Sequence, residues 1–171
     1  IIKSAGNDRT DIGDGTRPPD GPYDCLEPKS VAKNILTIGA VEHLNSTYTG
    51  PDDVIMSEFS SWGPTDDGRI KPDVVAMGVN VFSSAVANSG TTDSYASLSG
   101  TSMASPNVTG SLLLLQQLYS NRNSGRFMWA STLKALMINT TKEAGPNPGP
   151  DYTYGWGLLN TKGAAEIILN E

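Results

Sequence analysis

The chain has 171 residues and a formal net charge of −6, with 18 glycines, 11 prolines, one histidine and one cysteine. This length predicts a single domain that can bury most of its apolar surface, and the many glycines and prolines indicate frequent turns rather than a helical bundle. The negative charge argues against binding to nucleic acid or to an anionic membrane. A lone cysteine excludes an internal disulfide, and the sequence contains neither a membrane-spanning apolar run nor a signal-peptide pattern.

The chain begins with a short predicted strand that ends in a turn. Ile1 and Ile2 start the strand, and the small residues Ala5 and Gly6 allow another backbone or a ligand to approach closely. Asn7 follows them, and asparagine tolerates turn geometry. From its surroundings alone, Asn7 is therefore a turn residue.

Residues 10–30 predict a loop, because glycines and prolines interrupt any regular spacing of apolar residues. Carboxylates gather in and beside this loop, and a hard cation such as Ca²⁺ prefers several oxygen ligands of this kind. Their spacing is not that of an EF-hand, so a solvated acidic loop is the main interpretation. These carboxylates belong to Asp8, Asp11, Asp14, Asp20 and Asp24. Cys25 lies in the same loop with no histidine nearby, which argues against a catalytic thiol.

Several segments after this loop predict strands. Residues 34–41 are rich in β-branched side chains and are apolar almost throughout, which is typical of a strand buried on both faces of a parallel sheet. Shorter extended segments are predicted over 74–76, 79–83 and 95–98. His43, the only histidine, follows the first of these strands among polar residues, so we expect it to be exposed.

Residues 98–110 are the most informative stretch. A small, polar, glycine-containing run leads to Ser102, and apolar helical residues follow directly, which puts Ser102 at or beside a helix N-terminus. Unpaired backbone N–H groups and the positive end of the helix dipole meet there, and both stabilise a developing negative charge. Pro106 is compatible with the first turn of this helix. Serine is also among the commonest N-cap residues, so a capping role for Ser102 is the alternative.

Two more helices are predicted after this one. Residues 130–139 place apolar side chains at the spacing of one helix face. A loop rich in proline and glycine follows over 145–151, and a last short helix spans 161–169. Asn160 or Thr161 is expected to cap this last helix.

The serine stretch resembles the nucleophile motif of the subtilisin-like serine proteases, the subtilases, in Gly100-Thr101-Ser102-Met103-Ala104-Ser105-Pro106. Other blocks resemble the same family in the same order along the chain. They are Ala5-Gly6-Asn7, the strand ending in Ile38-Gly39-Ala40-Val41, Phe59-Ser60-Ser61-Trp62-Gly63-Pro64, Lys71-Pro72-Asp73-Val74, and the closing Gly155-Trp156-Gly157-Leu158-Leu159-Asn160.

The resemblance implies an α/β fold with a three-layer, mostly parallel sheet and helices on both faces, present here as a partial domain. It implies that Ser102 is the nucleophile and that the Asn7 side-chain amide joins the Ser102 backbone N–H in an oxyanion hole. Loss of one such donor costs about 10²–10³ in rate, a magnitude that comes from subtilisin itself. Asp73 is structural in the family, so we expect it to satisfy backbone groups rather than to act in catalysis.

The aspartate and histidine motifs of the family precede the asparagine segment, and neither is found before Asn7. Residues 1–171 are therefore expected to be the C-terminal portion of a subtilase catalytic domain. His43 is not expected to act as the base, because the family's catalytic histidine lies upstream in a glycine-rich motif. Asn107 departs from the family, which commonly has a histidine there, and this change is expected to affect local packing only.

The expected function is that of a serine endopeptidase that cleaves polypeptides through an acyl-enzyme. A serine hydroxyl is a weak nucleophile without an adjacent base, so these 171 residues alone are expected to be inactive. The N-terminal half of the domain, which carries the base in the family, is therefore an expected partner. One alternative is a non-catalytic, subtilase-like binding module. Another is an esterase that uses His43, against which the absence of a Gly-x-Ser-x-Gly elbow argues.

Further expectations concern partners and location. An exposed sheet edge is expected near residues 1–4, through which the chain could self-associate. No cofactor is required for the chemistry, although the resemblance leaves a structural calcium open. A secreted or cell-envelope location is implied by the resemblance alone, and neither a nucleic acid nor a membrane is an expected partner.

Overall fold

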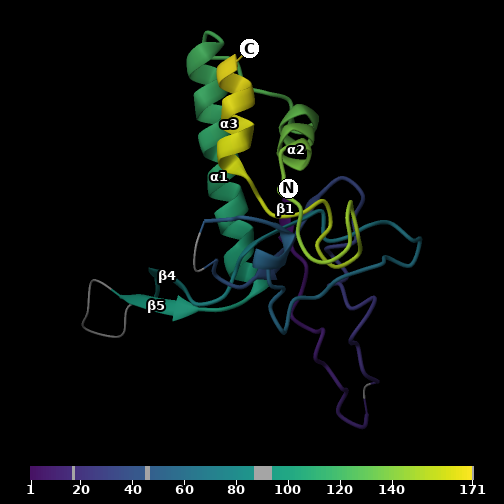
Figure 1. Cartoon of the computed structure of the whole chain (residues 1–171). Coiled ribbons are helices and arrows are strands. Elements are labelled where there is room, and N and C mark those ends of the chain that lie inside the picture. Colours follow the sequence, from purple (N-terminus) through teal and green to yellow (C-terminus); the bar gives the residue numbers. More distant parts are fainter. Residues whose placement is uncertain (17, 45–46, 87–93, 171) are drawn as a thin grey trace.

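The computed structural model describes residues 1–171 except 17, 45–46, 87–93 and 171. A parallel sheet in the order β1-β2-β3 forms its centre, a two-stranded antiparallel hairpin, β4-β5, projects to one side, and three helices stand together above the sheet (Figure 1). The strands are β1 (Ile2–Ser4), β2 (Leu36–Val41), β3 (Val74–Met77), β4 (Val81–Ser84) and β5 (Tyr95–Leu98). The helices are α1 (Thr101–Arg122), α2 (Ala130–Asn139) and α3 (Thr161–Asn170), besides a short 3₁₀ turn at Pro51–Asp53. Each predicted strand and helix is thus confirmed within a few residues.

The central strand, β2, is buried along its whole length, as its apolar sequence predicts. It pairs in parallel with both neighbours, with Ile2 opposite Leu36 and Ile38 opposite Val74. Side chains alternate between the two faces of a strand, so Ile38 and Val41 point to opposite sides of the sheet. A core cluster lies on each side.

All three described helices lie on the face of the sheet that carries Ile38. Helix α1 contacts every strand of the parallel sheet through residues such as Ala104 and Val108, and α2 and α3 pack against α1 (Figure 1). The opposite face, with Val41, is covered by loop residues such as Leu158. The α/β fold is therefore confirmed, with the difference that loops rather than helices cover the second face in the part of the chain that the structure describes.

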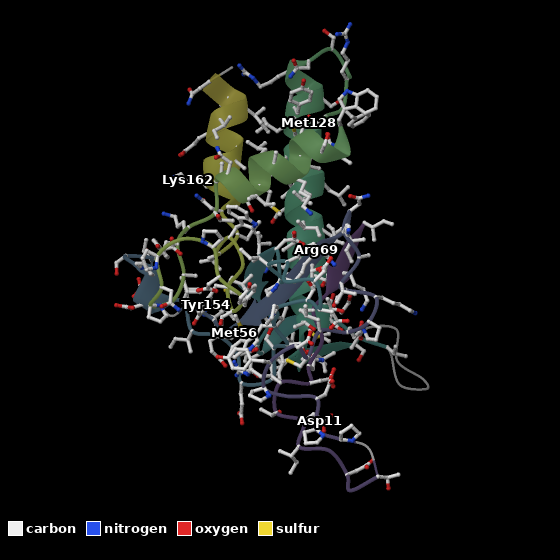
Figure 2. The ribbon with its side chains drawn as sticks, turned by 90° about the vertical axis from the view of Figure 1, so that its right-hand side faces the viewer. Asp11, Met56, Arg69, Met128, Tyr154 and Lys162 are labelled. Atoms are coloured by element: carbon white, nitrogen blue, oxygen red, sulfur yellow. The ribbon has the colours of Figure 1, made fainter. Side chains whose placement is uncertain are left out.

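Strand β1 forms one edge of the sheet, since its only described partner is β2. Ile1 is 96 % exposed beside it, and Leu113 and Leu114 of α1 are also exposed. The edge expected near the N-terminus is therefore present in the described residues. No described helix is long and apolar enough to cross a membrane. The acidic loop with Asp11 projects from the sheet at the end opposite Met128 and the helices (Figure 2).

Asp73 joins β2, β3 and α2 through its buried carboxylate. Its Oδ2 accepts the backbone N–H of Thr37 at 2.7 Å and lies 2.5 Å from the Lys71 Nζ. Its Oδ1 lies 3.1 Å from the Nζ of Lys134, on α2. Burial lowers the pKa of the Lys71 ammonium, and the hydrogen bond with Asp73 opposes that shift. The expected structural role of Asp73 is thus confirmed.

Candidate active site

The loop after β1 and the start of α1 meet at the carboxyl edge of the parallel sheet. Asn7 follows β1 and Gly78 follows β3, and the Gly100 N–H donates to the Gly78 carbonyl at 2.8 Å just before α1 begins. The carboxyl edge is the usual ligand-binding side of an α/β sheet. Both Asn7 and Ser102 are exposed there.

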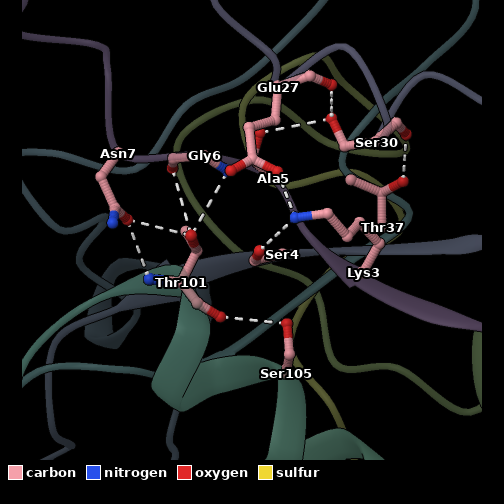
Figure 3. A network of polar contacts seen from close by, with 10 residues as sticks. All are labelled: Lys3, Ser4, Ala5, Gly6, Asn7, Glu27, Ser30, Thr37, Thr101 and Ser105. Atoms are coloured by element: carbon pink, nitrogen blue, oxygen red, sulfur yellow. Dashed lines mark hydrogen bonds and ion pairs between the residues drawn. The ribbon is translucent and has the colours of Figure 1, made fainter.

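The side chain of Asn7 is oriented by Thr101. Its Oδ1 accepts the backbone N–H of Thr101 at 3.0 Å and the Thr101 hydroxyl at 2.9 Å (Figure 3). Because a backbone N–H can only donate, the amide oxygen must face Thr101, which fixes the orientation of the amide group. The Nδ2 is therefore turned away from Thr101, and no hydrogen bond joins it to another residue in the part of the chain that the structure describes.

The first turn of α1 leaves one N–H group free. Gly100 is the N-cap and Ser102 is the second residue of the helix, so the alternative in which Ser102 caps the helix is wrong. The Thr101 N–H binds Asn7, and the N–H groups of Met103 and Ala104 donate to the Gly100 carbonyl at 2.9 and 3.4 Å. Among the described residues, the Ser102 N–H has no acceptor, as is common for a first-turn donor.

The Asn7 Nδ2 and the Ser102 N–H border the same small space. An ideal Cβ atom built on Gly100 would lie 3.6 Å from the Asn7 Nδ2 and 3.6 Å from the Ser102 nitrogen. Glycine leaves this space open, and its φ of +157° is one that a residue with a side chain rarely adopts. Two N–H donors beside an exposed serine hydroxyl can stabilise an oxyanion formed at that serine.

Thr101 is the site residue that sequence reasoning did not assign a role. It is 1 % exposed, and its hydroxyl both accepts the Gly6 N–H at 3.3 Å and contacts Asn7. In the sequence, Gly100 before Thr101 could have indicated this role. A glycine at the N-cap has no side chain that could bind the first N–H groups of the helix. An acceptor from elsewhere in the chain was therefore required.

An apolar cavity of about 420 Å³ lies between the β4-β5 hairpin and the start of α1. Leu98, Met103 and Pro106 line it. A larger cavity of about 950 Å³ lies between α2, α3 and Trp156 and includes neither Ser102 nor Asn7. Ser102 and Asn7 do not line the smaller cavity either, but its Met103 reaches the site, because the Met103 Sδ is 3.5 Å from the ideal Cβ atom on Gly100.

His43 is exposed and lines a different cavity with Asn107 and Thr161. In the residues that the structure describes, neither His43 nor any other side chain forms a hydrogen bond with the Ser102 hydroxyl. The described part of this chain therefore brings together the serine and two N–H donors, but not a base.

The cysteine and the acidic loop lie outside this arrangement. Cys25 is fully buried, with its sulfur 3.7 Å from the carbonyl oxygens of Pro22 and Trp62. The described residues contain no group of three or more His, Cys, Asp or Glu side chains placed to hold a metal ion. Calcium binding by the acidic loop stays the untested alternative to a solvated loop.

A serine at a helix start, beside amide donors and at the carboxyl edge of an α/β sheet, is the nucleophile and oxyanion part of the geometry that serine proteases use. The model of the subtilase family matches residues 1–157, so the chain belongs to the subtilase family. The C5a peptidase of Streptococcus pyogenes is 43% identical over 99 residues, which cover 58% of this chain and 8% of that protein. The PII-type proteinase of Lactococcus lactis subsp. cremoris is 32% identical over 127 residues, covering 66% of this chain and 6% of that protein.

Solved structures of proteases share the fold. The CspB protease of Clostridium perfringens is 28% identical with a TM-score of 0.70, over 88% of this chain and 30% of that one. The patellamide maturation protease PatA is 22% identical with a TM-score of 0.68, over 99% of this chain and 52% of that one. The chain thus spans about half or less of these structures and less than a tenth of the curated relatives.

Proposed function

We propose that residues 1–171 supply the nucleophile and the oxyanion donors of a serine endopeptidase. Ser102 attacks the scissile carbonyl of a polypeptide and gives its hydroxyl proton to the base. The tetrahedral intermediate then breaks its C–N bond and releases the protonated amine product, which leaves an acyl-enzyme that water hydrolyses. The observation that carries the proposal is the orientation of Asn7, whose Oδ1 binds Thr101 and whose Nδ2 borders the same space as the Ser102 N–H. Membership of the subtilase family supports the same reaction.

In this reaction the two N–H donors bind the carbonyl oxygen of the substrate as it becomes negatively charged. Their contribution is largest in the transition state, because the charge develops only there. The dipole of α1 adds a positive potential at the same place, since Ser102 lies in its first turn. The apolar cavity at Leu98 and Met103 is placed to receive an apolar part of the polypeptide.

The experiment is a peptidase assay on the full-length protein with a casein or peptide-library substrate. We expect Ser102→Ala to abolish cleavage and Asn7→Ala to lower kcat by about 10²–10³ with little change in KM. Ser131→Ala, at a serine of α2 in the cavity away from Ser102, is the control and should leave kcat unchanged. Cleavage that persists in Ser102→Ala would overturn the proposal.

We propose further that residues 1–171 are the C-terminal portion of the catalytic domain and that its N-terminal half supplies the base and its carboxylate. Support comes from the described contacts of Ser102, which include no base, and from the partial coverage of the related structures. A fluorophosphonate probe should therefore label residues 1–171 on their own negligibly. Rapid, stoichiometric labelling of Ser102 in this chain would contradict that, whereas a full-length protein without peptidase activity would favour the non-catalytic binding module.

Three further proposals concern location, calcium binding and self-association. A secreted or cell-envelope location rests on the family membership alone, and cell fractionation with an antibody against residues 1–171 tests it. Calcium binding rests on the carboxylates of the acidic loop, and a change in Tm on addition of Ca²⁺ tests it. Self-association through the β1 edge is tested by sedimentation of residues 1–171 at several concentrations.

A further inference from the structure

The residues on both sides of Asn7 are held by one buried serine, Ser61. The Ser61 N–H donates to the Gly6 carbonyl at 2.9 Å, and the Ser61 Oγ accepts the Asp8 N–H at 3.0 Å. Ser61 is 0% exposed, so its side of both hydrogen bonds is shielded from water, while Asp8 is half-buried. Together they fix the backbone positions directly before and after Asn7.

Ser61 also limits where the backbone of Gly6 can lie. An ideal Cβ atom on Gly6 would be 2.8 Å from the Ser61 Oγ, and the φ of Gly6 is +120°. Only glycine combines this close approach with this backbone conformation. The loop is therefore packed against Ser61 without room for a shift in that direction.

Arg9 attaches the same loop to the segment that contains Ser61. Its guanidinium donates to the carbonyl oxygens of Ser57 at 2.5 Å and Glu58 at 2.7 Å, and it lies 4.3 Å from the centre of the Trp62 ring. Residues 57–62 thus bind the loop at Gly6, Asp8 and Arg9. The side chain of Asn7 instead contacts α1.

We propose that Ser61 is a positioning residue for the oxyanion site, which acts on the reaction only through Asn7. The inference rests on the proposed function and deepens it. An oxyanion donor is effective only when it is held within a fraction of an ångström of its productive position. Without the Ser61 hydroxyl, the Asp8 N–H loses its acceptor and the Asn7 amide loses part of its support, which weakens transition-state binding but not substrate binding.

The experiment is steady-state kinetics of Ser61→Ala in the full-length protein. We expect kcat to fall about tenfold, the effect of about one hydrogen bond, while KM stays within about twofold. Ser60→Ala is the matched control, because Ser60 is equally buried, and its Oγ accepts the Ala40 N–H in β2 at 3.0 Å and makes only a long hydrogen bond of 3.5 Å to the Ser61 carbonyl, without contacting the loop. Its kcat should stay within about twofold of wild type.

A double-mutant cycle with Asn7→Ala separates positioning from general destabilisation. If Ser61 acts through Asn7, Ser61→Ala causes no further loss of kcat in the Asn7→Ala protein. An equal loss in both backgrounds, or an equal loss in Ser60→Ala, would overturn the inference. If Ser61→Ala does not fold, Ser61→Cys replaces it, since its thiol is a weaker acceptor, and a loss of about threefold that disappears in the Asn7→Ala background is expected.

The same measurements distinguish the inference from the proposed function. Full activity of Ser61→Ala in a protein that Ser102→Ala and Asn7→Ala inactivate would overturn the role of Ser61 alone. A protein whose Ser102→Ala variant still cleaves would overturn the proposed function first.

Discussion

Asn7 and Thr101, 94 positions apart in the chain, are joined by two hydrogen bonds that end on the same amide oxygen. The backbone N–H of Thr101 is the first orphan donor of α1, and Asn7 accepts it in place of an N-cap side chain. One side chain thus completes the helix start with its oxygen and offers its nitrogen to the site. In the proposed function, helix capping and oxyanion binding therefore depend on the same amide.

Thr101→Val tests this dependence, because it removes the hydroxyl and keeps the backbone N–H. The Asn7 amide then retains one of its two hydrogen bonds, and we expect kcat of the full-length protein to fall about fivefold to tenfold with little change in KM. Thr101→Ser keeps the hydroxyl and should retain most of kcat. Equal kcat in the valine and wild-type proteins would show that the hydroxyl does not orient Asn7.

Gly100→Ala is expected to abolish most of the activity. Its methyl group would occupy the space between the Asn7 Nδ2 and the Ser102 nitrogen, and the φ of +157° would be strained. We expect kcat to fall by about 10² or more. The control is Gly110→Ala in the exposed middle of α1, where an added Cβ meets no atom within 4 Å, and urea unfolding should show about 1 kcal/mol of added stability.

The short motifs around Asn7 and Ser102, through their resemblance to the subtilases, predicted that these two residues lie near each other, and the structure places both beside Gly100. Their roles in catalysis stay predictions. The orientation of the Asn7 amide could not be predicted in the same way. It depends on a hydrogen bond to Thr101 from a segment 94 positions away. Likewise, nothing local to Lys134 indicates that its ammonium reaches Asp73, 3.1 Å away on another element.

The layer arrangement was only partly predictable. The apolar strand over 34–41 correctly indicated burial on both faces, but a strand's own sequence does not say whether helices or loops cover each face. In the described residues, the second face is covered by side chains such as Val54 and Leu158, which lie outside any helix. That covering depends on tertiary packing rather than on local periodicity.

Asp73→Asn is expected to destabilise the fold strongly. Lys71 is 2% exposed, and the change leaves its buried ammonium without the carboxylate that holds it, which costs about 3–5 kcal/mol. Urea unfolding of residues 1–171 measures the loss. Lys162→Ala is the control, because its pair with Glu166 is long at 3.8 Å and exposed, and its loss should cost about 0.5 kcal/mol or less. A similar cost for both variants would contradict the central position of Asp73.

Asp67 is expected to contribute to the acid sensitivity of the fold. Hydrogen bonds from Arg69 and Thr65 lower the pKa of its carboxyl to about 2 from 3.8. Because the folded-state pKa is the lower one, this stabilisation is fully present above about pH 4 and is lost as the pH falls towards 2. Asp67→Asn should therefore reduce the difference in urea midpoint between pH 5 and pH 2.5. An unchanged difference would argue against the contribution of Asp67.

The most direct test of the central claim is the rate at which a fluorophosphonate probe labels the full-length protein, with the labelled residue located by mass spectrometry. We predict that the label is found on Ser102 and that Asn7→Ala slows labelling by about 10²-fold, because the adduct forms through a charged oxygen that both donors bind. Labelling of another residue, or an equal rate in the Asn7→Ala protein, would contradict the convergence of Asn7 and Ser102 on one oxyanion.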